Sequence, residues 1–175
     1  YLDKKYSFIL KDRETKIHAN VIINKFCKRS KINIRNRILY ELQKLTEVEP
    51  NLNMSLNYEV MNWSQLIKIN NNKLFTIGGH NLYHDTFTYI SHNKIYDEIY
   101  NTIHLLEKNL KTPIEHYSYP EGQESDYNEN VIRNLKLQGI KCCPSAIYGF
   151  NSNSSNLFHL KRIMPGFMNT KFPIN

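Results

Sequence analysis

Residues 77–84 read Ile-Gly-Gly-His-Asn-Leu-Tyr-His and follow a short apolar run, residues 73–77, that is typical of a β-strand. His80 and His84 are four positions apart. On a helical turn this spacing places both imidazoles on one face, with β-carbons roughly 6 Å apart, so both could bind one metal ion. The spacing has little specificity by itself, because chance pairs are common in a chain with 7 histidines. The prediction of a metal site therefore depends on the sequence around it.

Hydrophobic periodicity predicts several helices around this motif. Residues 17–48 are expected to be helical, and a short helix is expected to follow Asn62. Ser91 is the expected N-cap of an amphipathic helix that ends before Pro113. The pair Asp126 and Glu129 has the spacing of a capping box for a further helix, which should end at Gly139.

Strands are expected between these helices, over residues 73–77, 114–119, 140–147 and 157–164. The alternation of strands and helices implies parallel pairing and an α/β fold. Functional residues in such folds gather at the carboxyl ends of the strands. The histidine motif and the turn at residues 120–122, Pro-Glu-Gly, both lie at such ends. We therefore expect them to face one site.

These segments together resemble the motifs of a known family. Residues 61–66, which contain a Trp-x-x-Leu helix, and residues 77–84 are similar to the second motif of the polysaccharide deacetylases, the NodB homology domain or carbohydrate esterase family four. Residues 119–122, Tyr-Pro-Glu-Gly, resemble the third motif, and residues 160–163, Leu-Lys-Arg-Ile, resemble the closing strand of the shorter members. The resemblance covers roughly residues 60–165, and its order and spacing are specific although each motif is short.

The resemblance implies a fold and a chemistry. The fold is α/β, a partial distorted (β/α) barrel with parallel strands and outer helices. The activity is hydrolysis of N-acetyl or O-acetyl groups on a polysaccharide or other glycan. The cofactor is a divalent metal, commonly zinc, held by two histidines and an aspartate. His80 and His84 match the two histidines, and open metal positions would serve water and the acetyl carbonyl.

Further roles are implied around the third motif. The backbone N–H at Glu121 would donate to the oxyanion, and Tyr119, Pro120 and Gly122 would line the substrate site. The Glu121 side chain is either a substrate contact or a solvated loop residue. His159 lies near the place of the family's late general-acid histidine, but its spacing differs, so it is either that acid or a histidine of the surface or strand packing.

One motif of the family has no counterpart in this sequence. The aspartate pair that supplies the general base and the third metal ligand is absent, since neither Asp3 nor Asp12 lies in a Thr-Phe-Asp-Asp-type strand. Because the chain does not begin with Met, we expect a single domain over residues 1–175 that is incomplete at its N-terminus, with a variable helical part, 1–59, and a deacetylase-like core, 60–167. A true loss of the motif is the alternative, and would give a non-catalytic carbohydrate-binding relative.

The charge, the cysteines and the apolar runs of the sequence limit the possible partners and compartments. The formal net charge is +7, and much of the excess lies in one stretch that is either a solvated face or an anion-binding surface, residues 25–37. No nucleic acid is expected, because no aromatic stacking motif accompanies the charge. The 3 cysteines form no disulfide framework, which favours a reducing compartment without excluding the cell envelope. No apolar run predicts a transmembrane helix, and no signal peptide is evident.

Overall fold

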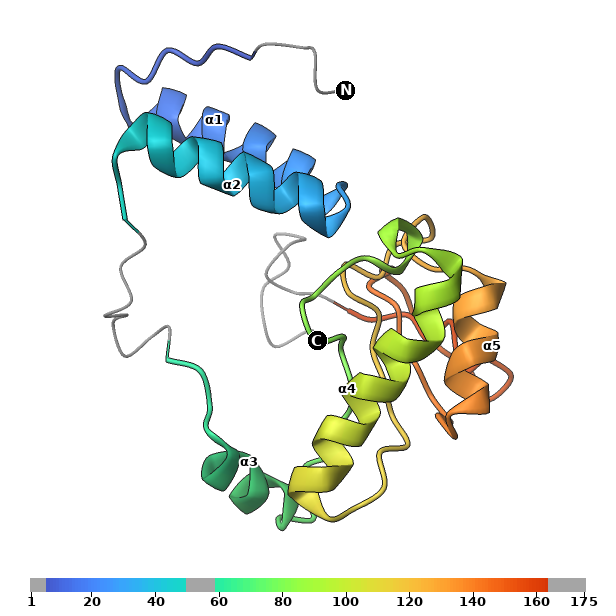
Figure 1. The fold of residues 1–175 in the computed structure, drawn as a ribbon. Coiled ribbons are helices and arrows are strands. Elements are labelled where there is room, and N and C mark those ends of the chain that lie inside the picture. Colours follow the sequence, from blue (N-terminus) through green and yellow to red (C-terminus); the bar gives the residue numbers. More distant parts are fainter. Residues whose placement is uncertain (1–5, 50–58, 164–175) are drawn as a thin grey trace, which may run out of the picture. The chain divides into compact units, whose positions relative to one another are not determined.

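The computed structural model describes residues 6–49 and 59–163 (Figure 1). The chain forms two compact units, Tyr1–Pro50 and Asn51–Asn175. Within the described ranges, no helix is both long and apolar enough to cross a membrane.

The first unit contains two helices that contact each other, α1 (Arg13–Lys28) and α2 (Ile32–Thr46). The helical character expected over residues 17–48 is therefore confirmed, but it is divided between two helices with a break at residues 29–31. After α1 the hydroxyl of Ser30 donates to the carbonyl of Phe26 at 2.7 Å, and the chain becomes extended at Lys31 before α2 begins. This break lets the apolar stripes of the two helices face each other, which one continuous helix could not do.

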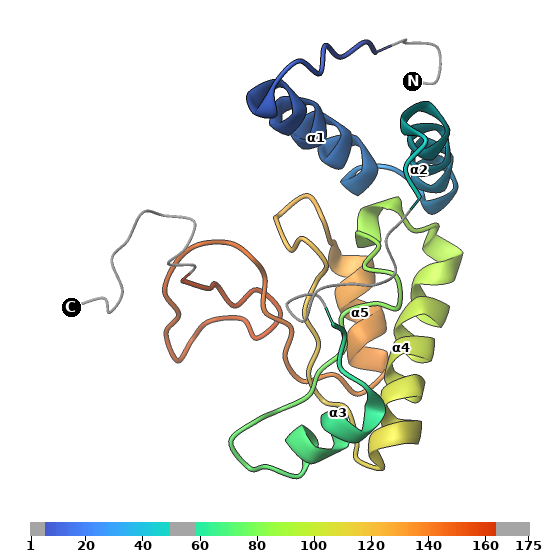
Figure 2. The same cartoon turned by 90° about the vertical axis from the view of Figure 1, so that its left-hand side faces the viewer.

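The second unit contains three α-helices, α3 (Trp63–Asn70), α4 (Ile95–Leu110) and α5 (Glu129–Leu137). α4 contacts both of the others, as the two views of the ribbon show (Figures 1 and 2). Two short 3-10 turns, η2 (Phe87–Tyr89) and η3 (His92–Lys94), precede α4.

The caps of these helices confirm some predictions and correct others. The short helix after Asn62 is confirmed, and the Asn62 side chain accepts from the Gln65 N–H at 3.0 Å. Ser91 makes no side-chain cap, because η3 intervenes and α4 begins only at Ile95. The N-terminus of that helix was thus predicted three residues too early, since the observed N-cap is Lys94.

The expected capping box of α5 is also wrong. The cap is Asn128, whose side chain accepts from the Val131 N–H at 3.2 Å. The carboxylate of Asp126 instead accepts from the Gln123 N–H at 2.8 Å, in the turn before the helix. The expected end of the helix is confirmed, since Gly139 has a φ of +81° that suits glycine best.

Four segments that follow one another along the chain lie side by side, around Gly79, Tyr117, Cys142 and residues 157–162. Parallel bridges join Gly79 to Tyr117 and His116 to Cys142, and the Cys143 N–H donates to the Leu157 carbonyl at 2.9 Å. The predicted parallel direction is confirmed. The predicted strands are not: the described residues pair through isolated bridges alone, and no closed barrel is seen in them.

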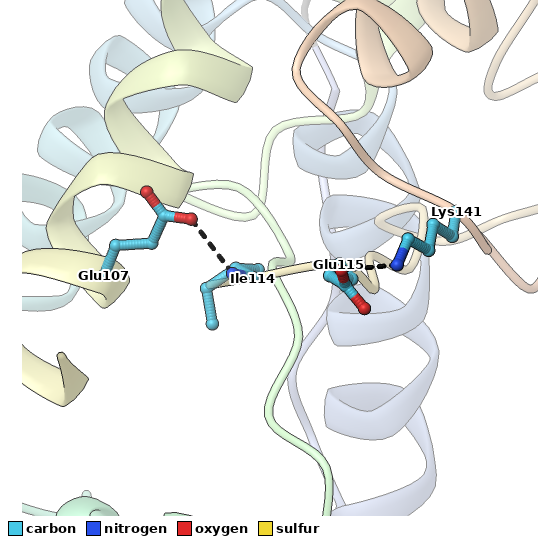
Figure 3. Close-up of polar contacts among 4 residues, drawn as sticks. All are labelled: Glu107, Ile114, Glu115 and Lys141. Carbon is cyan, nitrogen blue, oxygen red and sulfur yellow. Dashed lines mark hydrogen bonds and ion pairs between the residues drawn. The ribbon is translucent and has the colours of Figure 1, made fainter. Parts of the chain in front are cut away.

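Prolines help to explain why these segments pair so briefly. Pro120 and Pro144 lack an N–H and interrupt the second and third segments. Side chains support the pairing where it occurs, as Figure 3 shows. Glu107 of α4 accepts from the Ile114 N–H at 3.0 Å, and Lys141 forms an ion pair with Glu115 at 2.5 Å. That pair is exposed and contributes little stability, about 0–1 kcal/mol.

The hydrophobic core of the second unit lies between these segments and the helices α4 and α5. α4 contributes Ile95, Ile99 and Ile103 at steps of four, and α5 contributes Val131 and Leu135. Burial of each such side chain stabilises the fold by about 1.5–3 kcal/mol relative to exposure. This core fixes the parallel segments and therefore the loops at their carboxyl ends.

Candidate functional site

Gly79 fixes the start of the histidine loop against the neighbouring segment. Its N–H donates to the His116 carbonyl at 3.0 Å, and its carbonyl accepts from the Ser118 N–H at 2.9 Å. A β-carbon added at Gly79 would lie 2.3 Å from the ring of Tyr117, which is buried. Only glycine therefore allows this close approach, and the next residue, His80, begins the loop at a defined position.

The loop over residues 80–85 is not the helical turn that the His-x-x-x-His spacing suggested. Asn81 and His84 both have left-handed backbone conformations, with φ of 59° and 56°. The Tyr117 hydroxyl accepts from the Asn81 N–H at 2.8 Å and donates to the Asn81 side-chain oxygen. The Asn81 side chain then donates to the Asp85 carbonyl at 2.6 Å. An irregular loop held by side chains therefore replaces the expected helix.

α4 holds the same loop from a second side. The carboxylate of Glu98 accepts from the Leu82 N–H at 2.9 Å. Glu98 and Tyr117 come from different elements, a helix and a parallel segment. Two of the three backbone N–H groups between the histidines, those of Asn81 and Leu82, thus have partners outside the loop. This arrangement presets the loop before any ligand binds.

His80 is half-buried and held by Ser118. Its Nδ1 lies 2.8 Å from the Ser118 carbonyl oxygen and 2.9 Å from the Ser118 hydroxyl. A carbonyl oxygen can only accept a hydrogen bond, so Nδ1 carries the proton, and in the neutral ring Nε2 keeps its lone pair. This is the arrangement common among metal-binding histidines, in which one ring nitrogen is anchored and the other is available as a ligand.

The rings of His80 and His84 lie together, with centroids 4.8 Å apart and planes inclined at 73°. Burial lowers the pKa of His80 below its usual 6.5 as the first cause. Electrostatic interactions with His84 and Arg162 lower this pKa further, while the backbone contact with Ser118 and the charge of Glu121 raise it. The His80 ring is therefore neutral at pH 7, the state that a metal ligand requires.

The turn at Glu121 and Gly122 follows the segment that anchors His80 through Ser118. Both residues have positive φ, 60° and 68°, and the Gly122 N–H donates to the Pro120 carbonyl at 2.7 Å. The Gly122 carbonyl accepts from the Ala146 N–H at 2.8 Å. The Gly122 N–H thus already has a partner within the turn, and the oxyanion role of the Glu121 N–H stays a prediction. The charge of the Glu121 carboxylate raises the pKa of His80, against the larger effect of burial.

Tyr119 does not present its ring to an open surface. Its side chain is 0% exposed, and its hydroxyl donates to the Phe158 carbonyl at 3.0 Å. Its ring stacks on Tyr127 with centroids 3.7 Å apart. Pro120 and Gly122 are buried as well. The substrate contacts expected from Tyr119, Pro120 and Gly122 are therefore not available at the surface in this structure.

His159 lies at the end of the same aromatic group. It is exposed, and its Nδ1 is 3.1 Å from the hydroxyl of Tyr127. No interaction places it beside His80 or His84 among those seen in residues 6–49 and 59–163. Its role as a general acid stays a prediction.

The donor atoms of this site fit part of a metal-binding set. Imidazoles are ligands that zinc and related divalent ions prefer, and one of the two here, that of His80, is anchored through Nδ1. The described parts of the chain contain no group of three or more His, Cys, Asp or Glu side chains that could hold such an ion. The structure therefore offers two ligands, and the expected aspartate ligand is not found among them.

Several residues that shape the site were not identified from the sequence. Tyr117 and Glu98 hold the loop between the histidines. Ser118 anchors the ring of His80, and Arg162 lowers the pKa of His80. One signal was present: Asn81 is of a type that accepts a left-handed backbone, which argues against a helical turn there. Contacts with distant segments, such as Ser118 with His80, leave no local pattern.

The comparisons with known proteins concern the family and the fold of this chain. A family model described as polysaccharide deacetylase matches residues 34–142. Among solved structures, Streptococcus pyogenes deacetylase PplD in complex with acetate has a TM-score of 0.55 and 18% identity over 77% of this chain and 60% of that one. The deacetylase domain of BpsB from Bordetella bronchiseptica has a TM-score of 0.51 and 14% identity over 67% of this chain and 56% of that one.

A third solved structure, the polysaccharide deacetylase BC0361 from Bacillus cereus, has a TM-score of 0.52 and 15% identity over 74% of this chain and 43% of that one. This chain thus spans between 43% and 60% of the length of these three proteins. No curated protein sequence matches it significantly. At such identities the solved structures show a shared fold. The family match covers more than half of the sequence, so the chain belongs to the polysaccharide deacetylase family.

Proposed function

We propose that this protein is a metal-dependent deacetylase that removes N-acetyl or O-acetyl groups from a polysaccharide or other glycan. The proposal depends above all on the preset histidine pair, in which His80 is neutral, anchored through Nδ1 and next to His84. A divalent ion, zinc by preference, would be held by the two imidazoles, and the family leads us to expect a carboxylate as third ligand.

The chain's own residues would prepare this site for hydrolysis. Ser118 keeps the ring of His80 in one orientation and one tautomer, with Nε2 directed away from its anchor. Tyr117 and Glu98 fix the loop between the histidines, so little ordering is needed when a ligand binds. A bound divalent ion would supply Lewis acidity and lower the pKa of water towards about 7.

The turn at Glu121 is the candidate contact for the acetyl group. Its backbone has a left-handed conformation, and such turns can direct an N–H group at developing negative charge. The Glu121 carboxylate adds negative charge, which favours a bound cation and disfavours an anionic substrate group close by. A neutral N-acetylated or O-acetylated sugar is therefore the substrate class that this charge pattern fits best.

Metal binding and acetate release test the proposal separately. The protein expressed from its complete reading frame would be titrated with Co²⁺, whose visible spectrum reports imidazole ligands, and assayed for acetate release from chitin oligomers. We expect His80→Ala and His84→Ala each to weaken metal affinity at least about 100-fold and to abolish acetate release. The matched control is His92→Ala, since His92 is exposed and lies on η3.

Two outcomes would redirect the proposal. Metal affinity that is unchanged by both histidine substitutions would overturn the site. Metal binding without acetate release, together with binding of chitin oligomers, would support the alternative of a non-catalytic carbohydrate-binding relative. That alternative is favoured by one observation, the lack of a third protein ligand among the described residues. For the 175-residue chain alone we expect little or no activity, because a missing general base costs roughly 10²–10⁴ in rate.

A further inference from the structure

The positive charge of the chain is concentrated in one helical hairpin. Residues 13–46, which form α1 and α2, contain nine Lys or Arg residues and two Glu residues, a net charge of +7. The whole chain also has a net charge of +7, so the other residues balance at 14 basic and 14 acidic side chains. The unit with the histidine pair is nearly neutral. The charge therefore belongs to the hairpin and not to the candidate deacetylase site.

One face of α1 combines this charge with apolar side chains. Arg13, Ile17, Val21 and Lys25 follow one another at steps of four, and Lys28 comes three residues later, so all five project from the same side of the helix. All five are exposed, Ile17 at 51% and Val21 at 58%. We call this set the basic-apolar face.

The opposite side of α1 is the one that packs. Ala19 and Cys27 are buried, and Ile22, Ile23 and Phe26 are half-buried on that side. α1 contacts α2, and apolar side chains of this kind form the packed face of an amphipathic helix. The basic-apolar face is therefore distinct from the buried and half-buried side of α1, and its side chains are exposed.

α2 repeats the combination on its own exposed side. Leu39 and Tyr40 are 51% and 58% exposed, and Lys44 lies over the ring of Tyr40 at 5.5 Å. Arg37 is also exposed. Bulky apolar side chains next to Lys and Arg thus recur on both helices of the hairpin.

We propose that the hairpin binds the surface of a bilayer that contains anionic phospholipids, through the basic-apolar face of α1. Amphipathic helices of this composition lie in the interface, with apolar side chains among the acyl chains and Lys or Arg at the headgroups. A nucleic acid would be attracted by the positive charge, but its bases could not stack on Ile17 and Val21, which are aliphatic. The presence of aliphatic side chains within the basic face therefore favours lipid.

A hollow at the start of this face supports the same partner. It has a volume of about 450 Å³ and is lined by two cations, one apolar side chain and two other polar residues, namely Arg13, Lys16, Ile17, Asp12 and Asn20. The carboxylate of Asp12 is engaged by the Thr15 N–H at 2.8 Å, as the cap of α1. The two cations and Ile17 match the phosphate and the first methylenes of a lipid headgroup.

The test is flotation of the full 175-residue chain with lipid vesicles. Vesicles of phosphatidylcholine alone would be compared with vesicles that also contain phosphatidylglycerol, at low and high salt. We expect binding to the anionic vesicles only, and weaker binding at high salt. The variant R13Q/K25Q/K28Q should bind on the order of 100-fold more weakly, since each basic residue near a membrane contributes about a fivefold factor.

Two further variants separate the contribution of the apolar side chains from that of the positive charge. I17S/V21S keeps every charge and should weaken binding at least about tenfold, because two apolar side chains no longer enter the interface. K73Q/K94Q/K108Q removes the same charge from exposed positions of the second unit and should leave binding within about twofold of the parent. Circular dichroism would show that the helices persist in each variant.

The outcome does not depend on the deacetylase proposal, since no residue of the histidine site is altered. Equal binding to neutral vesicles, no binding to anionic ones, or an unchanged affinity of I17S/V21S would overturn the inference. So would tighter binding to a double-stranded oligonucleotide than to anionic vesicles at equal phosphate concentration, which would assign the face to nucleic acid.

Discussion

His80 is held between opposing influences on its charge. Burial and the electrostatic effects of His84 and Arg162 disfavour the imidazolium, whereas the Ser118 carbonyl and the carboxylate of Glu121 favour it. The first influence is the larger, so the pKa falls below 6.5. His80 is neutral at pH 7, and its Nδ1–H is held by the Ser118 carbonyl. Such a ring is suited to coordinate a metal ion, and less suited to bind a substrate through a positive charge.

The lowered pKa of His80 predicts a loss of stability in acid. In the unfolded chain His80 takes up a proton near pH 6.5, but in the folded chain it does so only at lower pH. The unfolded state therefore binds more protons in this window, and the free energy of unfolding falls as the pH falls from 6.5 to the folded pKa. His80→Gln should lose less stability than the parent across this range.

Urea unfolding at one pH above and one below 6.5 measures this difference for both proteins. The other six histidines are common to both, so the difference between the two pH dependences belongs to His80. An equal pH dependence in the parent and in His80→Gln would contradict the assignment of a burial-lowered pKa.

At the scale of elements, the sequence predicted the helices of the second unit better than its strands. The apolar stripe over Ile95, Ile99 and Ile103 is local, and it produced α4 within a few residues of its true start. The parallel segments at Gly79, Tyr117 and Cys142 pair through single bridges with distant segments. No local pattern reports how many hydrogen bonds such segments form, so the strands were overpredicted.

The same distinction explains what could be predicted of the site. The motif comparison identified His80 and His84 as candidate metal ligands, because both histidines and the preceding Gly-Gly pair lie in one continuous stretch of sequence, residues 77–84. Tyr117 and Glu98 were missed, because each acts on the loop from more than ten positions away. The loop's conformation was wrong for a related reason: the i, i+4 spacing fits a helix as well as the turn that Asn81 and Tyr117 enforce.

Two glycines allow the close packing of these elements to be tested. In Gly79→Ala the new β-carbon would meet the buried ring of Tyr117 at 2.3 Å, so that ring or the backbone must move. Overpacking of this kind costs about 2–3 kcal/mol. In Gly139→Ala no atom lies within 4 Å of the added carbon, and the cost is the strain of a positive φ, about 1 kcal/mol.

Denaturant unfolding of both variants gives the comparison. Gly79→Ala should lose more stability, and it should also weaken metal binding, since a displaced Tyr117 no longer holds Asn81. Gly139→Ala should leave metal affinity unchanged. A Gly79→Ala variant as stable as Gly139→Ala would show that the approach between residues 79 and 117 is looser than the structure has it.

At the scale of the whole molecule, the two units differ in both charge and core. The buried cluster of the second unit is drawn entirely from residues 87–158 and includes fifteen side chains. The hairpin buries only Ala19 and Cys27 among its described residues, and α2 has no buried residue. Most helical stability in proteins comes from packing of an apolar face, so the hairpin has little to stabilise it.

This asymmetry predicts unequal protection of backbone amides in hydrogen exchange. Amides of α4 and α5 should exchange only through opening of the second unit's core, whereas amides of α1 and α2 should exchange through local opening of the hairpin at much lower free energy. The hairpin amides should be protected roughly 100-fold less. Mass spectrometry of peptides from residues 13–46 and 95–137 measures both sets in one sample. Equal protection would mean that the two units unfold together, which a core confined to residues 87–158 cannot bring about by itself.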